Sequence, residues 1–372
     1  MKKLGFGLMR LPVLDPANAA SVDIEQLKQM VDRFLERGFT YFDTAWMYND
    51  FASEGAAKAA LVDRHPRDSF TLTTKLHAAF FNSLEDRDKV FNAQLEKTGV
   101  EYFDYYLLHD IEEGSFRKFE QYDCFNWLRE KKARGLAKHV GFSFHDTPEL
   151  LDEVLTKHPE MEYVQLQINY LDWESEWIQS RKCYEVCVKH NKPVIVMEPV
   201  KGGSLAKMPA EAEKLFRDAA PDMSLPSWAI RFAASLPNVM VVLSGMSTLE
   251  QVEDNTAYME NFKPLTGDEQ ALCFRVADII NAQIAIPCTG CSYCTAGCPM
   301  QIAIPQYFSL YNDIKREDME LKGWTVTYTK YNVTAEKHGK ASDCIGCGQC
   351  EGICPQHLPI IDYLKQVASC FE

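Results

Sequence analysis

The sequence predicts an α/β protein in which a (β/α)8 TIM barrel is followed by a smaller, mostly helical domain. Up to about residue 262, eight short β-rich runs alternate with longer amphipathic runs, and several β-rich runs are apolar throughout, as buried parallel strands are. From about residue 284 the composition changes, and eight of the 13 cysteines fall in two short runs. We therefore expect a barrel over residues 1–265, a helical connector over 266–283 and a cysteine-rich domain over 284–372.

The predicted strands are spaced so that a helix can follow each one. They occupy residues 4–9, 39–43, 70–74, 103–108, 139–143, 163–168, 193–198 and 239–244. Apolar residues at helical spacing predict helices over 24–35, 84–95 and 150–155. A doubly wound sheet is the alternative architecture, but it would usually carry a G-x-G-x-x-G turn after its first strand, and that turn is absent here.

The chain after the last predicted strand is expected to be helical. Two capping-box motifs, STLE at 247–250 and TGDE at 266–269, each start a helix, the second of which runs toward Asn281. Between the two cysteine runs we expect a helix over 306–315 and an irregular stretch over 324–331.

The net charge and the lengths of the apolar stretches argue against nucleic acid and membranes as partners. A net charge of −14 disfavours binding to nucleic acid or to an anionic membrane surface, because both need clustered Lys and Arg. No apolar stretch reaches the ~18 residues of a membrane span. Cysteines in such number without a secretory signal indicate a reducing compartment, and we expect the protein to be cytoplasmic.

The two cysteine runs share one spacing, C-x2-C-x2-C-x3-C-P. They comprise Cys288, Cys291, Cys294 and Cys298 in the first run and Cys344, Cys347, Cys350 and Cys354 in the second. This spacing is typical of two-cluster ferredoxins, in which three cysteines of a run hold one cluster and the fourth reaches the other. A zinc site would need C-x2-C pairs, each completed by a second pair, and does not need the third cysteine at x2 or the fourth at x3. A disulfide framework fits secreted domains under about 100 residues.

The two runs also resemble each other beyond their cysteines. CPMQIAIPQYF continues the first run and CPQHLPIIDYL the second, so each passes from Cys-Pro through an apolar-Pro step to a helix-like segment. The segment resembles a ferredoxin-type dicluster domain that arose by internal duplication, and it predicts two [4Fe–4S] clusters. The other five cysteines follow no ligand pattern, and we expect them to be packing residues.

Four polar side chains stand at or just after the ends of predicted strands. Asp43 ends the second strand, Tyr48 follows it, Lys75 ends the third and His109 ends the fourth. Active sites of such barrels lie at the carboxyl ends of the strands. With this set in place, the chain resembles the aldo-keto reductases over residues 1–265. The matching stretches are FTYFDTAWMY, TLTTKLH, YYLLHD, GFSFH, VQLQINY, VMEPVKGG and LSGMSTLEQVEDN.

The chemistry of a carbonyl reduction accounts for these four residues. A carbonyl that receives hydride needs a proton donor, and a free tyrosine with a pKa of about 10 is a weak acid at neutral pH. A nearby Lys75 would favour the tyrosinate and lower that value. We therefore predict that Tyr48 is the general acid, that Lys75 tunes it, that Asp43 holds Lys75, and that His109 orients the carbonyl oxygen.

The resemblance also implies a nicotinamide cofactor, NAD(H) or NADP(H). At the nicotinamide end it assigns Ser143 and Gln165 to the carboxamide, and Met197 to the position where many members place a stacking aromatic ring. Gly202, Gly203 and Leu205 fall in the loop over the pyrophosphate. At the other end, Gly245 and Gln251 fall where a Lys and an Arg often bind the 2′-phosphate, and Asn255 falls at the adenine. Without those cations we expect NADH to bind about as well as NADPH.

Two functions remain open from the sequence. The first is an NAD(P)-dependent oxidoreductase that acts on a small carbonyl or alcohol substrate and carries two clusters for electron transfer or for structure. The second is an electron-transfer component that docks a redox partner protein and uses the barrel as a scaffold. Hydride carries two electrons and a cluster passes one, so direct exchange would call for a flavin, which the mouth of the barrel could bind.

Overall fold

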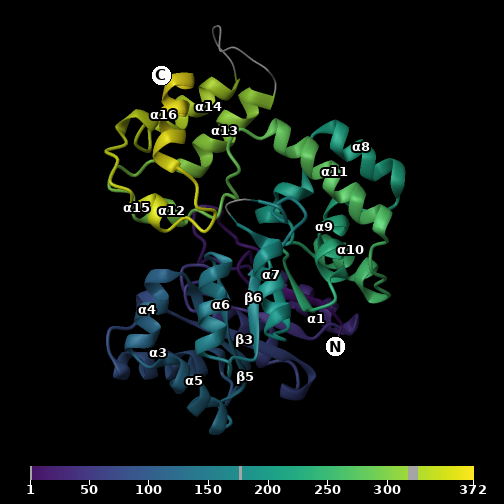
Figure 1. Cartoon of the computed structure of the whole chain (residues 1–372), viewed down its shortest axis with the longest axis vertical. Helices are drawn as coiled ribbons and strands as arrows, with labels where there is room; N and C mark the ends of the chain where they lie inside the picture. Colours follow the sequence, from purple (N-terminus) through teal and green to yellow (C-terminus); the bar gives the residue numbers. More distant parts are fainter. Residues whose placement is uncertain (1, 176–177, 317–325) are drawn as a thin grey trace. The chain divides into compact units, whose positions relative to one another are not determined.

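The computed structural model describes residues 2–175, 178–316 and 326–372 (Figure 1). Contacts within the chain divide it into two compact units. The first unit contains Met1–Glu174, Gln179–Pro199 and Pro226–Gln270. The second contains Val200–Leu225 and Ala271–Glu372, together with Ser175 and Ile178.

The first unit is a closed barrel of eight parallel strands in sequence order, which confirms the predicted fold class. The strands are β1 (Leu4–Gly7), β2 (Tyr41–Asp43), β3 (Thr71–His77), β4 (Phe103–Ile111), β5 (Ala137–Phe144), β6 (Tyr163–Gln167), β7 (Val194–Met197) and β8 (Val239–Gly245). β3 and β4 run further than predicted, because most of their last residues are polar and looked like loop.

Side chains fill the interior of the barrel. Tyr41, Leu107, Tyr163 and Ile195 belong to one buried cluster to which β2, β4, β6 and β7 each contribute, as expected of a packed barrel core. Gly141 on β5 leaves room for this cluster, since a Cβ there would lie 2.4 Å from the carbonyl oxygen of Tyr163. The barrel is therefore a rigid support for the polar residues at its carboxyl ends.

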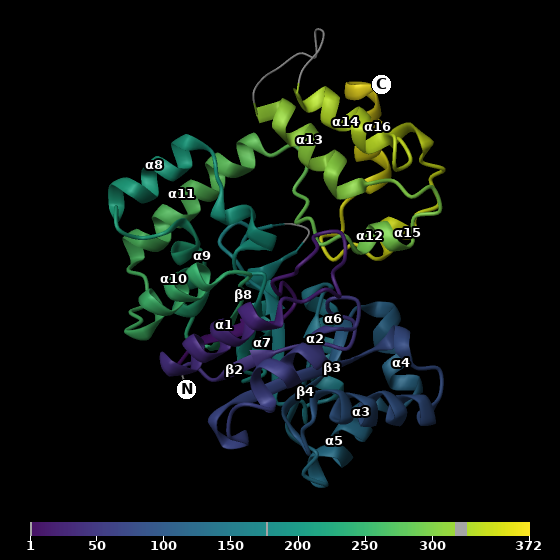
Figure 2. The ribbon, with the colours of Figure 1, turned by 180° about the vertical axis from the view of Figure 1, so that it is seen from behind.

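Helices surround the strands, and the view from behind shows α1 and α2 beside β2 and β3 (Figure 2). The helices of this part of the chain are α1 (Ile24–Glu36), α2 (Ser53–Ala57), α3 (Leu84–Thr98), α4 (Glu113–Gln121), α5 (Cys124–Ala133), α6 (Pro148–Lys157), α7 (Ser180–Lys189), α9 (Leu225–Ser235) and α10 (Leu249–Glu260). The three helices predicted from periodicity correspond to α1, α3 and α6.

The two predicted capping boxes have different outcomes. At the start of α10 the N-cap is Thr248, one residue later than predicted, and its hydroxyl accepts from the backbone N–H of Gln251 (3.3 Å). At the start of α11 (Gly267–Gln283) the box is reciprocal. The backbone N–H of Thr266 donates to Glu269 (2.8 Å), and that of Glu269 donates to the Thr266 hydroxyl (3.3 Å).

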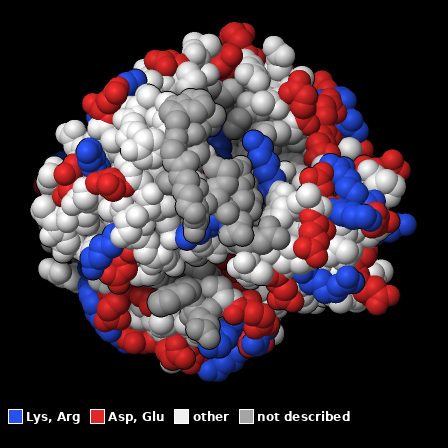
Figure 3. Space-filling view, turned by 90° about the horizontal axis from the view of Figure 1, so that it is seen from above, with Lys and Arg blue, Asp and Glu red and all other residues white. Residues whose placement is uncertain are grey.

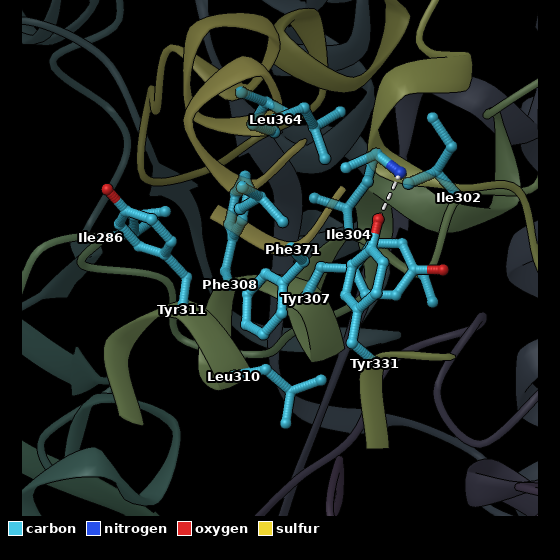
Figure 4. Close-up of a cluster of buried hydrophobic side chains, with 14 of the residues drawn as sticks. Ile286, Ile302, Ile304, Tyr307, Phe308, Leu310, Tyr311, Tyr331, Leu364 and Phe371 are labelled. Atoms are coloured by element: carbon cyan, nitrogen blue, oxygen red, sulfur yellow. Dashed lines mark hydrogen bonds between the residues drawn. The ribbon is translucent and has the colours of Figure 1, made fainter. Parts of the chain in front are cut away.

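The second unit is helical apart from its loops. Its helices are α8 (Ala210–Ala219), most of α11, α12 (Tyr293–Ala296), α13 (Ile304–Arg316), α14 (Val326–Ala335), α15 (Gln349–Gly352) and α16 (Ile360–Phe371). Its apolar core includes three aromatic rings in a row (Figure 4). Tyr331 stacks on Phe371 at 4.6 Å between ring centroids and lies 4.5 Å from Tyr307.

The duplication seen in the sequence is repeated in the backbone. α12 and α15 have the same length, and each contains the third cysteine of its run. Left-handed residues occur at matched positions of the two runs: Gly290 and Gly346, Ser292 and Gly348, Gln301 and His357. The long helices α13 and α16 begin at equivalent positions after the last cysteine. Each run therefore folds into the same local scaffold for its thiols.

One expectation between the cysteine runs was wrong. Residues 326–331 belong to helix α14 and are not irregular, whereas positions 324 and 325 lie outside the described residues. The β-branched and aromatic residues of VTYTKYNVTA have low helix propensity, and the burial of Tyr331 against Phe371 overrides it.

No membrane-spanning helix is found in the described part of the chain. None of its helices has both the length and the apolar content to cross a bilayer. On the face shown in Figure 3, acidic and basic side chains are interspersed over the atoms that are coloured by charge.

Candidate functional site

A buried ion pair lies at the carboxyl ends of β2 and β3. The ammonium of Lys75 donates to Oδ1 of Asp43 (2.5 Å) and to the carbonyl of Thr44 (2.7 Å), and both charged side chains are excluded from solvent. Burial raises the pKa of Asp43 and lowers the pKa of Lys75, while the attraction between the two charges opposes both shifts. The carboxylate of Asp43 and the ammonium of Lys75 therefore stabilise each other's charged form.

Breaking this pair should destabilise the barrel. Asp43→Asn keeps the shape of the side chain but leaves the Lys75 ammonium buried without a countercharge, and we expect a loss of about 3–5 kcal/mol in the free energy of unfolding. Urea unfolding of the full chain, followed by circular dichroism, measures it. Glu113→Gln removes an exposed ion pair to Arg117 and should cost about 0–1 kcal/mol. Equal stability of the two variants would contradict the assigned role of the buried pair.

Tyr48 and His109 complete the predicted set of four residues. The Lys75 ammonium lies 5.0 Å from the centroid of the Tyr48 ring, and the rings of Tyr48 and His109 meet edge to face at 6.0 Å. Burial, followed by the charges of His77 and Lys75, lowers the pKa of His109 well below its usual value. His109 is therefore neutral at neutral pH, and a neutral imidazole can donate one hydrogen bond to a substrate oxygen.

Three further polar residues that the sequence reading missed surround His109. The ring of His77 meets that of His109 at 5.3 Å between centroids. Nε2 of His77 lies 3.6 Å from the Asp110 carboxylate, and that of His145 lies 3.9 Å from it. Burial alone would raise the pKa of Asp110, but the two imidazoles lower it below its ordinary value. His77 could have been found, since it follows Lys75 by two residues and so faces the same side of β3.

Three of the predicted cofactor positions lie on neighbouring strands. Ser143 on β5 is in register with Gln165 on β6, and the Gln165 amide lies 3.6 Å from the sulfur of Met197 at the end of β7. Gln165 is buried, and its Oε1 has no hydrogen-bond partner among the described residues. A buried amide oxygen without a donor is costly, so this carboxamide fits a ligand that supplies an N–H group.

The positions predicted near the 2′-phosphate are uncharged, but a cation lies beside them. Gly245 leaves space for Arg10, because a Cβ on this glycine would lie 3.4 Å from three carbons of the arginine side chain. Nη2 of Arg10 is buried without a hydrogen-bond partner in the described chain. Gln251 accepts from the backbone N–H of Ser247 (2.7 Å), and Asn255 bonds to other side chains of the barrel.

Gly202, Gly203 and Leu205 lie in the helical turn Lys201–Ala206, which belongs to the second unit. Both glycines have left-handed backbone, at φ 64° and 98°, which only glycine adopts at little cost. Leu205 is fully buried. The structure therefore groups these three predicted positions with the cysteine-rich part of the chain.

The eight cysteines of the two runs line two depressions in the second unit, each with about 320 Å³ of space that is partly open to solvent. One depression is lined by the first cysteine set, Cys288, Cys291, Cys294 and Cys354, and the other by the second cysteine set, Cys344, Cys347, Cys350 and Cys298. Each set thus combines three cysteines of one run with the last cysteine of the other. In the described ranges no three His, Cys, Asp or Glu side chains converge closely enough to hold a single metal ion.

Burial of three thiols in these sets favours their protonated form. Burial raises the pKa of Cys288 to about 11 and that of Cys294 to about 12, and burial together with Glu351 raises that of Cys350 to about 11. Thiolates must form for ligation, so the binding of a metal group here would release protons. The backbone N–H of Gly290 already points at the sulfur of Cys288 (3.4 Å).

Comparison with known proteins identifies both parts of the chain. A family model described as Aldo/keto reductase family matches residues 3–277, and a model described as 4Fe-4S dicluster domain matches residues 287–358. The uncharacterized oxidoreductase YqkF of Bacillus subtilis is 23% identical over 305 residues, which are 72% of this chain and 94% of that protein. An aldo-keto reductase of Mycolicibacterium vanbaalenii is 27% identical over 66% of this chain and 81% of its own length.

Solved structures share the barrel fold. The holo form of an aldo-keto reductase from Bacillus halodurans has a TM-score of 0.59 and 24% identity, and covers 74% of this chain and 91% of its own. An aldo/keto reductase from Klebsiella pneumoniae, solved in complex with NADP and acetate, has a TM-score of 0.60 and 19% identity with the same coverage.

Proposed function

Because the chain belongs to the aldo/keto reductase family, we propose that it transfers hydride between a nicotinamide cofactor and a carbonyl or alcohol substrate, and that its C-terminal domain binds two [4Fe–4S] clusters. One observation carries the first half of this proposal. Asp43, Tyr48, Lys75 and His109 come from three segments of the sequence and are gathered at the carboxyl ends of the barrel strands. Single polar residues at strand ends are common, whereas this combination matches the requirements of a carbonyl reduction.

Each residue of this set has a separate task. A bound nicotinamide would supply the hydride. Tyr48 donates a proton to the oxygen that becomes negative when the carbonyl is reduced. The Lys75 ammonium beside the tyrosine ring favours the tyrosinate that remains, and Asp43 holds Lys75 in this position. The neutral His109 orients the carbonyl oxygen by hydrogen bonding.

The nicotinamide assignment is supported by the barrel's own polar groups and by one related structure. The unpartnered amide oxygen of Gln165, beside Ser143 and Met197, is suited to the carboxamide N–H of the cofactor. The Klebsiella pneumoniae enzyme, which has the same fold, was solved with NADP. These observations support a nicotinamide at the carboxyl ends of β5 to β7.

We expect Arg10 to determine the choice between the two nicotinamide cofactors. The aliphatic part of its side chain packs on Gly245, and its guanidinium would face the 2′-phosphate that Gly245 and Gln251 cannot bind. A charge-assisted hydrogen bond contributes about 1.5–3 kcal/mol, so Arg10→Met should weaken NADPH binding by about 10- to 100-fold. The same variant should leave NADH binding nearly unchanged. Fluorescence titration with both nucleotides measures the two affinities.

Arg129→Met is the matched control for this experiment, because Arg129 is an exposed arginine on α5. It should change neither affinity. An equal loss for NADH and NADPH in the Arg10 variant would mean that Arg10 supports the site without reading the 2′-phosphate.

The cluster assignment is supported by how the second unit groups the thiols. Each depression is lined by four cysteines and by apolar residues such as Ile304, and the pattern of three plus one agrees with the ligation of two-cluster ferredoxins. These clusters would pass electrons one at a time, or stabilise the fold of the unit, or do both.

The proposal is tested with protein purified without oxygen. Its visible spectrum and iron content report the clusters, and steady-state oxidation of NADH or NADPH in the presence of a panel of aldehydes and ketones reports the reductase. We expect turnover with at least one carbonyl. If the loaded protein exchanges electrons with a one-electron acceptor but turns over no carbonyl, the second function, an electron-transfer component, replaces the first.

A further inference from the structure

A buried carboxylate outside the predicted set of four residues is linked to the strand of Lys75. Glu54, at the start of α2, is inaccessible to solvent. Its Oε1 accepts hydrogen bonds from the Thr74 hydroxyl (2.7 Å) and from the side-chain amide of Gln94 on α3 (2.8 Å). The same amide donates to the carbonyl of Lys75 (2.9 Å). One oxygen of Glu54 therefore helps to fix the end of β3.

The other oxygen of Glu54 faces a cation from α3. Oε2 is buried without a hydrogen-bond partner in the described part of the chain, and the ammonium of Lys97 lies 3.7 Å from it. Burial raises the pKa of Glu54, while its two hydrogen bonds and the charge of Lys97 oppose this shift. Lys97 follows Gln94 by three residues, so both side chains extend from one face of the helix.

Lys97 also contacts the segment that carries Tyr48. Its ammonium lies 4.5 Å from the centroid of the Trp46 ring and 5.9 Å from that of the Phe51 ring. These distances are within the range of a cation–π attraction. The two rings meet edge to face at 6.1 Å, and they flank Tyr48 in the sequence. Lys97 thus joins the Glu54 carboxylate to residues on both sides of the tyrosine.

The backbone that follows Tyr48 is strained and needs such contacts. Asn49, Asp50 and Phe51 are three successive residues in the left-handed region, at φ 51°, 49° and 69°. A side chain makes this conformation unfavourable, and more so for a bulky residue than for Asn or Asp. Strained backbone persists only where its surroundings hold it, and such positions cluster at functional sites. The contact between Phe51 and Lys97 is one that can hold this segment.

From these contacts we propose that Glu54 and Lys97 are a pair of positioning residues, which keep Tyr48 beside the ammonium that tunes it. This inference rests on the proposed role of Tyr48 as proton donor. Glu54 holds the strand of Lys75 through one oxygen, and through the other it holds Lys97. Lys97 in turn holds the segment of Tyr48, whose ring lies 5.0 Å from the Lys75 ammonium. The pair acts through these two residues and exchanges no proton with the substrate.

The test measures kcat, KM and nucleotide affinity of the full chain, with a carbonyl that the wild type reduces. Lys97→Met keeps an unbranched apolar side chain but removes the ammonium. We expect kcat to fall by about 10- to 100-fold, because a misplacement of about 1 Å can have an effect of that size. KM and nucleotide affinity should stay at their wild-type values. Lys97→Arg should restore most of kcat, since a guanidinium also pairs with a carboxylate and stacks on aromatic rings.

Two further variants make the test specific. Glu54→Gln keeps the shape of the side chain and removes the charge that holds Lys97, so kcat should fall by a similar factor. The double variant should be no slower than the slower single one, because both changes break the same link. Lys118→Met is the matched control, since the ammonium of Lys118 also lies near an aromatic ring, 5.1 Å from the centroid of Phe81, but outside this network. It should keep the wild-type kcat.

The outcomes separate this inference from the proposed function. A wild type that reduces no carbonyl would refute both, whereas a wild type that needs Tyr48 but loses no kcat on Lys97→Met would overturn the inference alone. So would a parallel loss of nucleotide affinity, or additive losses in the double variant, because either indicates a general weakening of the barrel. Circular dichroism checks folding first. If Glu54→Gln does not fold, rescue of Lys97→Met by Lys97→Arg decides, since Lys97 is 27% exposed.

Discussion

Replacing Tyr48 by phenylalanine should abolish most carbonyl turnover while the barrel and its nucleotide affinity stay intact. The variant lacks only the phenolic hydroxyl, so the ring contacts with His109 and Lys75 are retained. General acid catalysis is worth about 10²–10⁴ in rate, and we expect kcat to fall by that factor. Steady-state reduction of an aldehyde measures kcat, and fluorescence titration measures the affinity for the nicotinamide.

Tyr102→Phe is the matched control, because Tyr102 lies outside the set of four residues and its ring packs against the side chains of Arg67 and Lys138. Its kcat should equal that of the wild type. A Tyr48→Phe enzyme with unchanged kcat would remove Tyr48 from the role of proton donor. A loss of nucleotide affinity in parallel with kcat would instead assign Tyr48 to cofactor binding.

The barrel and the set of four residues could be predicted because both depend on local patterns. Apolar runs such as VIVM in β7 indicate strands that are buried on both faces. The carboxyl ends of parallel strands meet at one end of a barrel, so polar residues that end successive strands must come together. The ion pair between Asp43 and Lys75 follows from this rule without any knowledge of side-chain geometry.

Arg10 and Lys201 could not be predicted, because their partners are distant in the sequence. Arg10 follows the first strand and packs on Gly245 at the end of the last one, and Lys201 is 155 residues from Gln356. Arg10 lies outside the stretches that carry the resemblance, Lys201 lies in VMEPVKGG without a role assigned to it, and a lone basic residue in a loop is usually solvated. The contact between Arg10 and Gly245 forms only when the barrel closes, and the contact between Lys201 and Gln356 forms only when the second unit folds.

The assignment of residues 200–225 to the second unit also could not be predicted from the order of motifs in the sequence. Residues 200–225 lie inside the stretch that the barrel pattern spans, yet they pack with the cysteine-rich part of the chain. A prediction of continuous domains cannot describe a unit that is built from several separate segments of the sequence. The place of residues 200–225 in the second unit brings Lys201 to Gln356, which lines the depression of the first cysteine set.

The grouping of the cysteines leads to a second prediction with a large expected effect, the loss of one cluster. Cys354 belongs to the second run in the sequence but lines the depression of Cys288, Cys291 and Cys294. If it is a ligand there, Cys354→Ala should remove one cluster, and the iron content should fall from about eight to about four atoms per chain. Iron analysis and electron paramagnetic resonance of the reduced protein measure the loss.

The identity of the lost cluster follows from comparing variants in pairs. With crossed ligation, Cys354→Ala and Cys291→Ala lose the same resonance, and Cys298→Ala and Cys347→Ala lose the other one. Cys370→Ala is the control, since Cys370 lines neither depression and should keep all its iron. If Cys354→Ala instead gave the spectrum of Cys347→Ala, each run would hold its own cluster. Crossed ligation also makes each run depend on the other, so metal binding contributes directly to the folding of the second unit.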